Sequence, residues 1–368
     1  MYKVLVLGMN SNLGGIENFL YNYCKNMNPE KVHFDFLCNT SQPIAFETEL
    51  KSMGADVKYH VSRHKNFFIY IKELNYFFKH YAKEYDAIWY NANCLANIDA
   101  MALAKRYGIK KRIIHAHNSK GKDGFLRDFL HLFGRMTIRS YATDFWACSH
   151  KAAEYAFPKN LLEKVVVIKN AVDVDKFAFN KDVREKIRKE LGVGDKFVIG
   201  HTGRFEYPKN HRFLIEVFNE VYKRNKNVVL LLVGKGEYEE EIRRITYDYG
   251  LNNNVIFYGM TPKVNELYQA MDCFVFPSRF EGLGISAVEA QAAGLKTLCS
   301  DAVPDDAGIT NLFEKMSLSY NYKVWADRVL EYNNGYDRID TSEWIKKAGY
   351  DIKQSAKQLE EIYFELSK

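Results

Sequence analysis

Two glutamates in the second half of the chain, Glu281 and Glu289, are separated by seven residues in the segment FEGLGISAVEAQAAG. Gly282 and Gly284 let the backbone approach a ligand closely, and the helix predicted after them presents free N–H groups that suit a phosphate. Glu289 lies among alanines on a helix that should be buried, where an unpartnered carboxylate is costly. The pattern indicates a nucleotide-sugar site, with one glutamate for the sugar and one for the ribose. The alternative is a capped helix whose Glu289 faces solvent.

Two cations, Arg204 and Lys209, follow a predicted strand at 197–201 and precede a predicted helix. Gly203 allows a turn directly after the strand. Fixed cations beside helix amides can hold a diphosphate leaving group without a metal ion. The alternative is that both side chains are simply solvated.

The first half carries its polar residues beside predicted strand ends. His115 and His117 end a strand at 111–116, and ligands of parallel sheets bind beyond the carboxyl ends of the strands. The sequence offers no evident third ligand for a metal pair. Near the N-terminus, Gly14 and Gly15 belong to a loop that does not fit the GxGxxG dinucleotide fingerprint.

These residues are positioned by short apolar strands that alternate with helical patterns, which is typical of parallel α/β layers. A first sheet is predicted from strands near 3–7, 32–38, 56–61, 86–90, 111–116, 144–148 and 164–168. A second is predicted from strands at 197–201, 228–233, 255–258, 273–276 and 295–299. The segment 303–319 is predicted to be irregular.

The glutamate pair resembles the signature of the retaining family-4 glycosyltransferases, which have the GT-B fold. The pattern Gly203-Arg204 to Lys209-Asn210 resembles the diphosphate clamp of that family, and Gly14-Gly15-Ile16-Glu17 resembles its GGxE turn. The chain departs from the family at Gly284, where many members have proline. The resemblance implies two groups of site residues: catalytic Glu281, His117, Arg204 and Lys209, with His115 as the fallback for His117; and donor-binding Gly14, Gly15, Gly203, Arg204, Lys209, Glu281, Gly282, Leu283, Gly284 and Glu289.

The resemblance also implies the architecture. We expect two Rossmann-like domains that face each other across a cleft: residues 1–172 for the acceptor and 173–350 for the nucleotide-sugar donor. The C-terminal helix, within 351–368, should cross back to the first domain. The segment 169–177 resembles the interdomain segment of the family, so its D-x-D triplet, Asp173 to Asp175, is interpreted as linker.

The implied activity is transfer of a sugar from a nucleotide sugar to a glycan or a lipid-linked acceptor, with retention of configuration. The region 303–325, with Trp325, most resembles the branch that builds bacterial capsule and exopolysaccharide. Neither a cofactor nor a metal is expected. Two alternatives remain open: a nucleotide-sugar epimerase of the same fold, which would need no acceptor, and a non-catalytic partner subunit.

Composition narrows the class of protein further. The chain has 368 residues, of which 47% are hydrophobic, enough for two packed domains. Six cysteines are scattered without a CxxC motif, which favours reduced thiols and a cytoplasmic location. No apolar run reaches the roughly 18 residues that span a bilayer, and no signal peptide is expected at Met1.

The net charge of +6 is unevenly distributed. Residues 1–170 hold 24 basic and 15 acidic side chains, a charge of +9, and the rest of the chain carries −3. A basic first half suggests an anionic partner such as a membrane surface or a lipid-linked phosphate; the alternative is a soluble basic domain without such a partner. Nucleic acid is not expected. The segment 119–140 is the candidate, because Phe125, Leu126, Phe129, Leu130 and Phe133 can share one helix face beside Lys120, Lys122, Arg127, Arg135 and Arg139. The alternative is ordinary packing of this face in the core.

Overall fold

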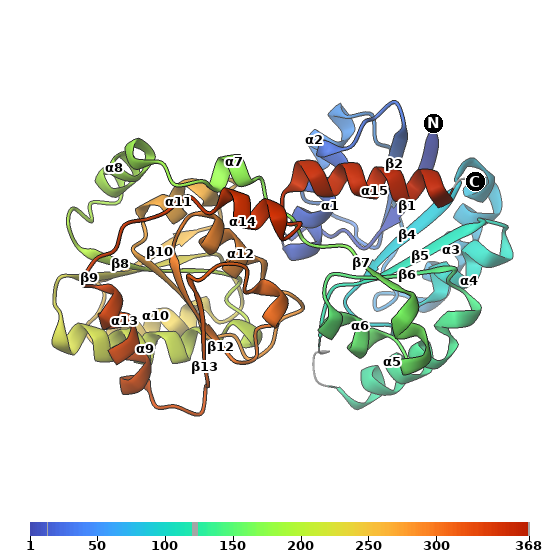
Figure 1. Cartoon of the computed structure of the whole chain (residues 1–368). Coiled ribbons are helices and arrows are strands. Elements are labelled where there is room, and N and C mark those ends of the chain that lie inside the picture. The colour runs from blue at the N-terminus through green and yellow to red at the C-terminus, as the bar shows by residue number, and fades with distance from the viewer. Residues whose placement is uncertain (13, 120–123, 367–368) are drawn as a thin grey trace. The chain divides into compact units, whose positions relative to one another are not determined.

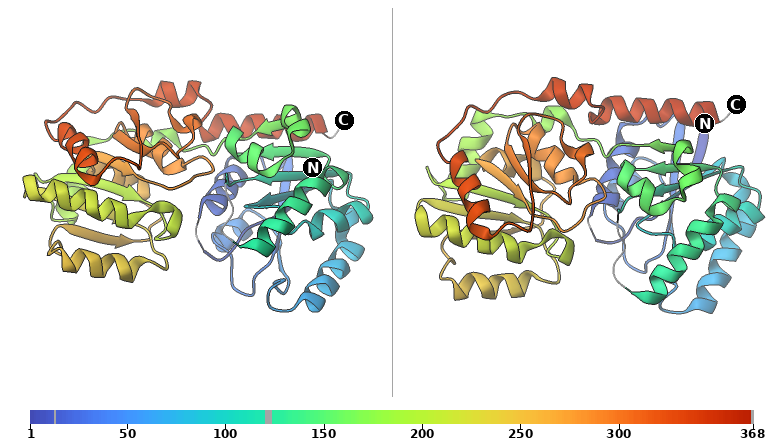
Figure 2. Two further views of the ribbon diagram at one scale, coloured as in Figure 1. Left: turned by 90° about the horizontal axis from the view of Figure 1, so that it is seen from below. Right: turned by 60° about the horizontal axis from the view of Figure 1, so that its bottom comes forward.

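The computed structural model describes residues 1–12, 14–119 and 124–366. The chain forms two compact units, each built on its own parallel sheet with helices on both faces (Figures 1 and 2). The first unit contains Met1–Ala171 and Asp351–Lys368, and the second contains Val172–Tyr350.

The first unit has a seven-stranded sheet in the order β3-β2-β1-β4-β5-β6-β7, with every pairing parallel. Central strands buried on both faces read as nearly continuous apolar runs, and Val4 to Leu7 is such a run. The strands are β1 (Tyr2–Leu7), β2 (Val32–Cys38), β3 (Val57–Tyr59), β4 (Ala87–Ala92), β5 (Lys111–Ala116), β6 (Asp144–Ala147) and β7 (Val165–Val167). The helices are α1 (Gly15–Asn26), α2 (Glu47–Ser52), α3 (Phe67–Tyr81), α4 (Asp99–Arg106), α5 (Phe125–Thr137), α6 (His150–Ala156) and α15 (Ile352–Leu366).

The last helix, α15, completes the core of the first unit, as the sequence predicted. It lies beside α1 (Figure 1) and buries Leu359 and Tyr363 in the same apolar cluster as Val4 and Trp89. The Tyr363 ring lies 6.2 Å from the indole of Trp89 and 5.7 Å from that of Trp146. Two long-range contacts of Glu360, to Lys31 Nζ at 2.6 Å and Asn28 N at 3.0 Å, hold the helix in register.

The second unit has a six-stranded parallel sheet in the order β10-β9-β8-β11-β12-β13. Its strand β9, which lies between β10 and β8, is buried at every position, which explains its unbroken apolar sequence. The strands are β8 (Phe197–Thr202), β9 (Val228–Val233), β10 (Val255–Gly259), β11 (Cys273–Phe276), β12 (Lys296–Ser300) and β13 (Phe313–Met316). The helices are α7 (Val174–Phe177), α8 (Lys181–Glu190), α9 (His211–Arg224), α10 (Glu239–Asp248), α11 (Val264–Ala270), α12 (Ile285–Ala292), α13 (Tyr322–Tyr332) and α14 (Ser342–Lys347).

The prediction that residues 303–319 are irregular is wrong in part. This segment contains β13, which pairs in parallel with β12 from Thr297–Phe313 to Ser300–Met316. The strand is short, its four residues are half-buried and two of them are charged. It lies at the edge of the sheet, where such sequences are tolerated and where the apolar signal of a buried strand is lost.

Candidate functional site

The loops after the strands of the second sheet meet backbone to backbone. Gly234 follows β9 with φ +143°, and a Cβ atom there would lie 2.1 Å from the carbonyl oxygen of Gly203, the residue after β8. A side chain at 234 would therefore push the two loops apart. Arg279 N donates to Pro208 O at 2.7 Å, so the loop after β11 is joined to the same edge. This packing positions the predicted clamp residues beside the predicted glutamates.

Lys209 and Glu281 form an ion pair at this edge, with 2.7 Å between Nζ and Oε1. Both side chains are largely buried, 21% and 12% exposed, and the Lys209 ammonium lies 4.6 Å from the centre of the Phe276 ring. A Cβ at Gly203 would lie 3.1 Å from Lys209 Cδ, so the glycine leaves room for the lysine chain. The structure thus brings together Gly203, Lys209 and Glu281.

Arg204 differs from Lys209 in its surroundings. Its side chain is 50% exposed and contacts Glu206, with Nη1 3.2 Å from Oε1. The chain then enters α9 through Asn210, which adopts the left-handed conformation at φ 57° and donates from Nδ2 to Pro277 O. Arg204 therefore offers an accessible guanidinium, whereas Lys209 offers an enclosed ammonium.

Glu289 lies on α12, half-buried, and accepts a hydrogen bond of 2.9 Å from the hydroxyl of Tyr268. Tyr268 is itself fully buried and contacts Thr202 Oγ1 at 2.6 Å, at the end of β8. Burial raises the pKa of Glu289 to about 7, against the opposing effects of the Tyr268 hydrogen bond and the positive charge of Lys209. At neutral pH this carboxyl is therefore close to half ionised.

The loop between the two glutamates is enclosed. Leu283 is 2% exposed, Gly282 is buried, and Gly284 begins α12 with φ +88°. A Cβ at Gly284 would lie 3.2 Å from Val303 Cγ1 and 3.3 Å from Phe276. Proline requires φ near −65°, so the proline common in the family would not fit this backbone. A proline at position 284 would therefore require a different loop conformation.

His117 in the first unit is held by Asn91. Its Nε2 lies 2.9 Å from Asn91 Oδ1, while Asn91 Nδ2 donates to the carbonyls of Leu7 and Trp89 at 3.3 Å. Because the amide of Asn91 is oriented by those carbonyls, Nε2 carries the proton and Nδ1 is left as an acceptor. His117 Nδ1 is buried and has no partner among the described residues. Burial lowers the pKa of His117 to about 3, so the ring is neutral.

His115 lies on the same face as His117, 4.2 Å between ring centres, because His117 N continues the ladder to Ala92 O. Its role is nevertheless different. His115 is fully buried and accepts at Nδ1 from the Trp89 indole at 3.3 Å. It packs in the core, and burial lowers its pKa well below 6.5.

Gly14 and Gly15 also lie in the first unit, at the start of α1. Gly14 has an extended backbone, and a Cβ at Gly15 would meet no atom within 4 Å. The adjoining Glu17 is 5% exposed and accepts from Asn10 N at 3.2 Å. The predicted site residues thus come from both units: Gly14, Gly15 and His117 from the first, the others from the second.

The D-x-D triplet lies at the start of the second unit. Asp173 caps α7 by accepting from Lys176 N, and its carboxylate lies 3.2 Å from Lys176 Nζ. Within the described residues, no three His, Cys, Asp or Glu side chains are grouped to hold a metal ion. In the part of the chain that the structure describes, no helix is long and apolar enough to cross a membrane.

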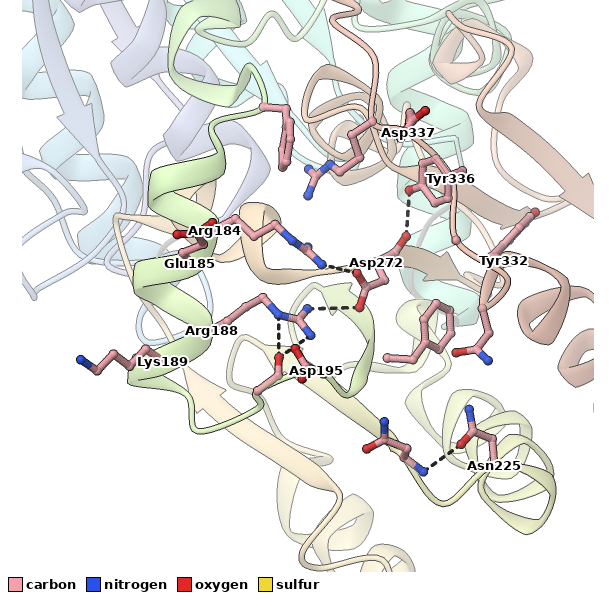
Figure 3. A pocket seen from close by; sticks show the side chains of 17 residues that line it. Arg184, Glu185, Arg188, Lys189, Asp195, Asn225, Asp272, Tyr332, Tyr336 and Asp337 are labelled. Atoms are coloured by element: carbon pink, nitrogen blue, oxygen red, sulfur yellow. Dashed lines mark hydrogen bonds and ion pairs between the residues drawn. The ribbon is translucent and has the colours of Figure 1, made fainter.

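A cavity of about 950 Å³ lies at the opposite edge of the second sheet, before β11 (Figure 3). Arg184 and Arg188 point at Asp272, which also accepts from Val198 N at 2.7 Å. Nearby, Arg338 donates to the carbonyls of Tyr268, Gln269 and Met271 at the end of α11, and burial lowers its pKa to about 9. These guanidiniums are satisfied by the protein itself, so the cluster stabilises the fold.

Comparisons with known proteins agree with this geometry. Residues 183–318 match the family described as "Glycosyl transferases group 1". The chain is 30% identical to glycosyltransferase EpsF of Bacillus subtilis (strain 168) over 98% of its length and 96% of that protein. It is 24% identical to the Staphylococcus aureus capsular polysaccharide biosynthesis glycosyltransferase CapH over 99% of both chains. The Anabaena Alr3699/HepE structure with UDP and glucose matches with a TM-score of 0.80 at 19% identity, covering 98% of this chain and 99% of that one.

Two parallel Rossmann-like sheets and the returning C-terminal helix define the GT-B class, which confirms the predicted fold. The chain belongs to the group 1 glycosyltransferases, the retaining family 4, which confirms the predicted family.

The sequence did not single out two residues that the structure places at these sites. Tyr268 contacts Glu289, and Asn91 orients His117. Asn210, which belongs to the clamp pattern, turns the chain into α9, and asparagine tolerates the left-handed conformation before a helix. Neither Tyr268 on α11 nor Asn91 on β4 has a motif around it.

Proposed function

We propose that this glycosyltransferase transfers a sugar from a nucleotide sugar to a glycan or lipid-linked saccharide, in the synthesis of capsular polysaccharide or exopolysaccharide. The observation that carries the proposal is the joining of Lys209, Glu281 and the Tyr268–Glu289 pair at one sheet edge. The similarity to CapH supports the process. The similarity to HepE, whose structure was solved with UDP and glucose, supports the class of donor.

In this proposal the second unit binds the donor. The Glu289 carboxylate accepts the ribose hydroxyls, and Glu281 with the amides of Gly282 to Gly284 faces the sugar and phosphate. Arg204 contributes an exposed cation and Lys209 an enclosed one to the diphosphate. The first unit binds the acceptor, and Gly14 and Gly15 border the donor diphosphate.

The proposed reaction is a front-face displacement with retention. The bond from the anomeric carbon to the phosphate oxygen breaks while the acceptor oxygen bonds to the same face of that carbon. The departing diphosphate oxygen takes the proton of the acceptor hydroxyl. Arg204, Lys209 and the amides at the start of α12 stabilise the charge on the leaving group. His117 contributes Nδ1 as an acceptor for a sugar hydroxyl, and no metal is required.

The partners follow from this scheme: a nucleotide sugar, a glycan or lipid-linked acceptor and, through the basic first unit, an anionic membrane surface. Such a surface would hold the protein peripherally, at the inner face of a plasma membrane. Support comes from α5, where Phe125 is 91%, Leu126 69% and Phe129 60% exposed, so these side chains do not pack in the core. Lys120 and Lys122 lie outside the described residues.

The deciding experiment measures nucleotide diphosphate release from a panel of nucleotide sugars with and without saccharide acceptors. Transfer that depends on the acceptor, with a product whose anomeric configuration matches the donor by NMR, is expected. Formation of an altered nucleotide sugar in the absence of an acceptor would instead establish an epimerase. Nucleotide binding without turnover on any acceptor would favour a non-catalytic partner subunit.

A further inference from the structure

A cavity of about 930 Å³ opens in the first unit at the carboxyl edge of its sheet. Leu7 and Ala92, the last residues of β1 and β4, lie at its base together with Asn91. Asn91 is the residue that orients His117, so one lining residue of the cavity directly contacts the histidine proposed for the sugar, although His117 itself does not line the cavity. Its walls continue outward to α3 and α5, which are light blue and teal in Figure 2.

The charged residues of this cavity are all of one sign. Arg63, Arg127, His60 and His64 line it, and no aspartate, glutamate or lysine is among its described lining residues. Burial lowers the pKa of His60, so the two arginines are the fixed charges. A cavity whose described lining has two guanidiniums and no carboxylate attracts an anion, and Asp99, 3.7 Å from Arg63, lies outside that lining.

Both arginines keep N–H groups that no contact with the described residues uses. Among those residues, the Arg127 guanidinium donates to a thiol, Cys94 Sγ at 3.3 and 3.4 Å, which is a weak acceptor. Arg63 is held by Ala96 O at 3.2 Å and by Asp99 at 3.7 Å, and neither contact uses all five of its N–H groups. Arg is the side chain that best matches phosphate oxygens.

The outer wall of the cavity is apolar, and part of it is exposed to solvent. It is formed by the side chains of Phe67, Tyr70, Leu74, Phe125, Leu126 and Leu130. Phe67 is 47%, Leu126 69% and Phe125 91% exposed. Exposed apolar side chains gathered at the mouth of a cationic cavity mark a binding surface for a molecule that has both an anionic and a hydrocarbon part.

We propose that this cavity binds the phosphate and the adjoining hydrocarbon of an acceptor that is carried on a lipid through phosphate. Arg63 and Arg127 hold the phosphate oxygens, the aromatic wall takes the start of the hydrocarbon chain, and the saccharide extends toward Asn91 and His117. The proposal rests on the proposed function and narrows its acceptor from a glycan or lipid-linked saccharide to a lipid phosphate.

Calorimetric titration of the full chain with farnesyl diphosphate tests the phosphate contacts. Saturable binding is expected, with inorganic diphosphate and farnesol each binding at least about tenfold more weakly. Arg127→Gln and Arg63→Gln should each weaken binding about tenfold or more, because a charge-assisted hydrogen bond is lost. Arg139→Gln is the matched control, since Arg139 is exposed and does not line the cavity. Absence of saturable binding, or equal weakening by all three substitutions, overturns the proposal; equal weakening would indicate attraction to general surface charge.

The hydrocarbon contact is tested on α5 with exposed side chains, whose replacement leaves the core intact. Phe125→Ser and Leu126→Ser should weaken farnesyl diphosphate binding several-fold, whereas Met136→Ser should not. Met136 is 73% exposed on the same helix but does not line the cavity. Equal affinity in all three variants overturns the hydrocarbon contact.

UDP binding by the same samples separates this inference from the proposed function. If UDP binds and farnesyl diphosphate does not, the acceptor site is wrong and the donor assignment stands. If farnesyl diphosphate binds as described but no nucleotide diphosphate does, the cavity assignment stands and the proposed transfer is wrong.

Discussion

Lys209 Nζ lies 2.7 Å from Glu281 Oε1, so the cation proposed for the diphosphate is paired with the carboxylate proposed for the sugar. The pair fixes the position of a largely buried lysine side chain. In the proposed donor site, the diphosphate would therefore meet an ammonium that is already positioned, as preorganised charge stabilisation requires.

Replacing either clamp cation should slow the reaction. Arg204→Ala and Lys209→Ala should each lower kcat about 10²-fold, on the order of 3 kcal/mol of lost charge stabilisation. Turnover is measured with saturating donor. Arg212→Ala, on the exposed side of α9, is the control and should retain the parent rate. Near-parent turnover in both clamp variants would remove them from the diphosphate site.

The two clamp variants should differ in stability. Lys209→Ala leaves Glu281 without its lysine partner in a site where that carboxylate is 12% exposed, so the melting temperature should fall. Arg204→Ala removes a half-exposed side chain and should leave the melting temperature nearly unchanged. Adding Glu281→Gln to Lys209→Ala should recover part of the loss. Equal melting temperatures for both single variants would contradict the enclosed ion pair.

Nucleotide affinity should depend on pH through Glu289. The ribose hydroxyls are donors to the ionised carboxylate, and burial raises the pKa of Glu289 to about 7 in the free protein. Binding must therefore release a proton below pH 7, and UDP affinity should rise about tenfold from pH 6 to pH 8. The Glu289→Gln variant should bind UDP more weakly at pH 8, and it should lose the part of the pH dependence that Glu289 causes. The part that comes from the UDP phosphate is the same in both proteins. Identical pH profiles would remove Glu289 from the ribose site.

His117 should act as a neutral acceptor. Because burial lowers its pKa to about 3, activity between pH 6 and 9 should show no titration of this ring. His117→Ala should lower kcat/KM about tenfold, the effect of one lost hydrogen bond in a buried site. Among deoxy-sugar donors, the one that lacks the hydroxyl facing Nδ1 should be insensitive to the substitution. A uniform loss across all deoxy donors would assign His117 a structural role.

Activity should not require a metal ion. In the proposed mechanism Arg204 and Lys209 provide the positive charge beside the diphosphate. Asp173 of the D-x-D triplet caps α7 and contacts Lys176. The rate in excess EDTA should equal the untreated rate. Loss of activity that Mg²⁺ or Mn²⁺ restores would overturn the displacement described above.

Much of this structure could be predicted from the sequence, because the signals for it are local. The apolar runs of β1 and β9 are continuous, so both sheets were predicted, and the glycines and charges around Glu281 and Arg204 marked the loops of the second unit. The pairs Asn91–His117 and Tyr268–Glu289 were not predictable in the same way. Each joins residues more than twenty positions apart across neighbouring elements. The cavity beside Arg63 and Arg127 likewise exists only once α3 and α5 are placed against the strand ends.

The return of α15 to the first unit has a consequence for the order of folding during synthesis. Residues up to Ala171 leave the ribosome without the helix whose Tyr363 and Leu359 belong to their core. The whole of Val172–Tyr350 must be translated first, which at ordinary elongation rates takes roughly 10 to 40 s. The second unit is continuous in sequence and can fold during that interval. During that interval the first unit lacks the apolar side chains of α15, so the part of its core that Leu359 and Tyr363 fill stays uncovered.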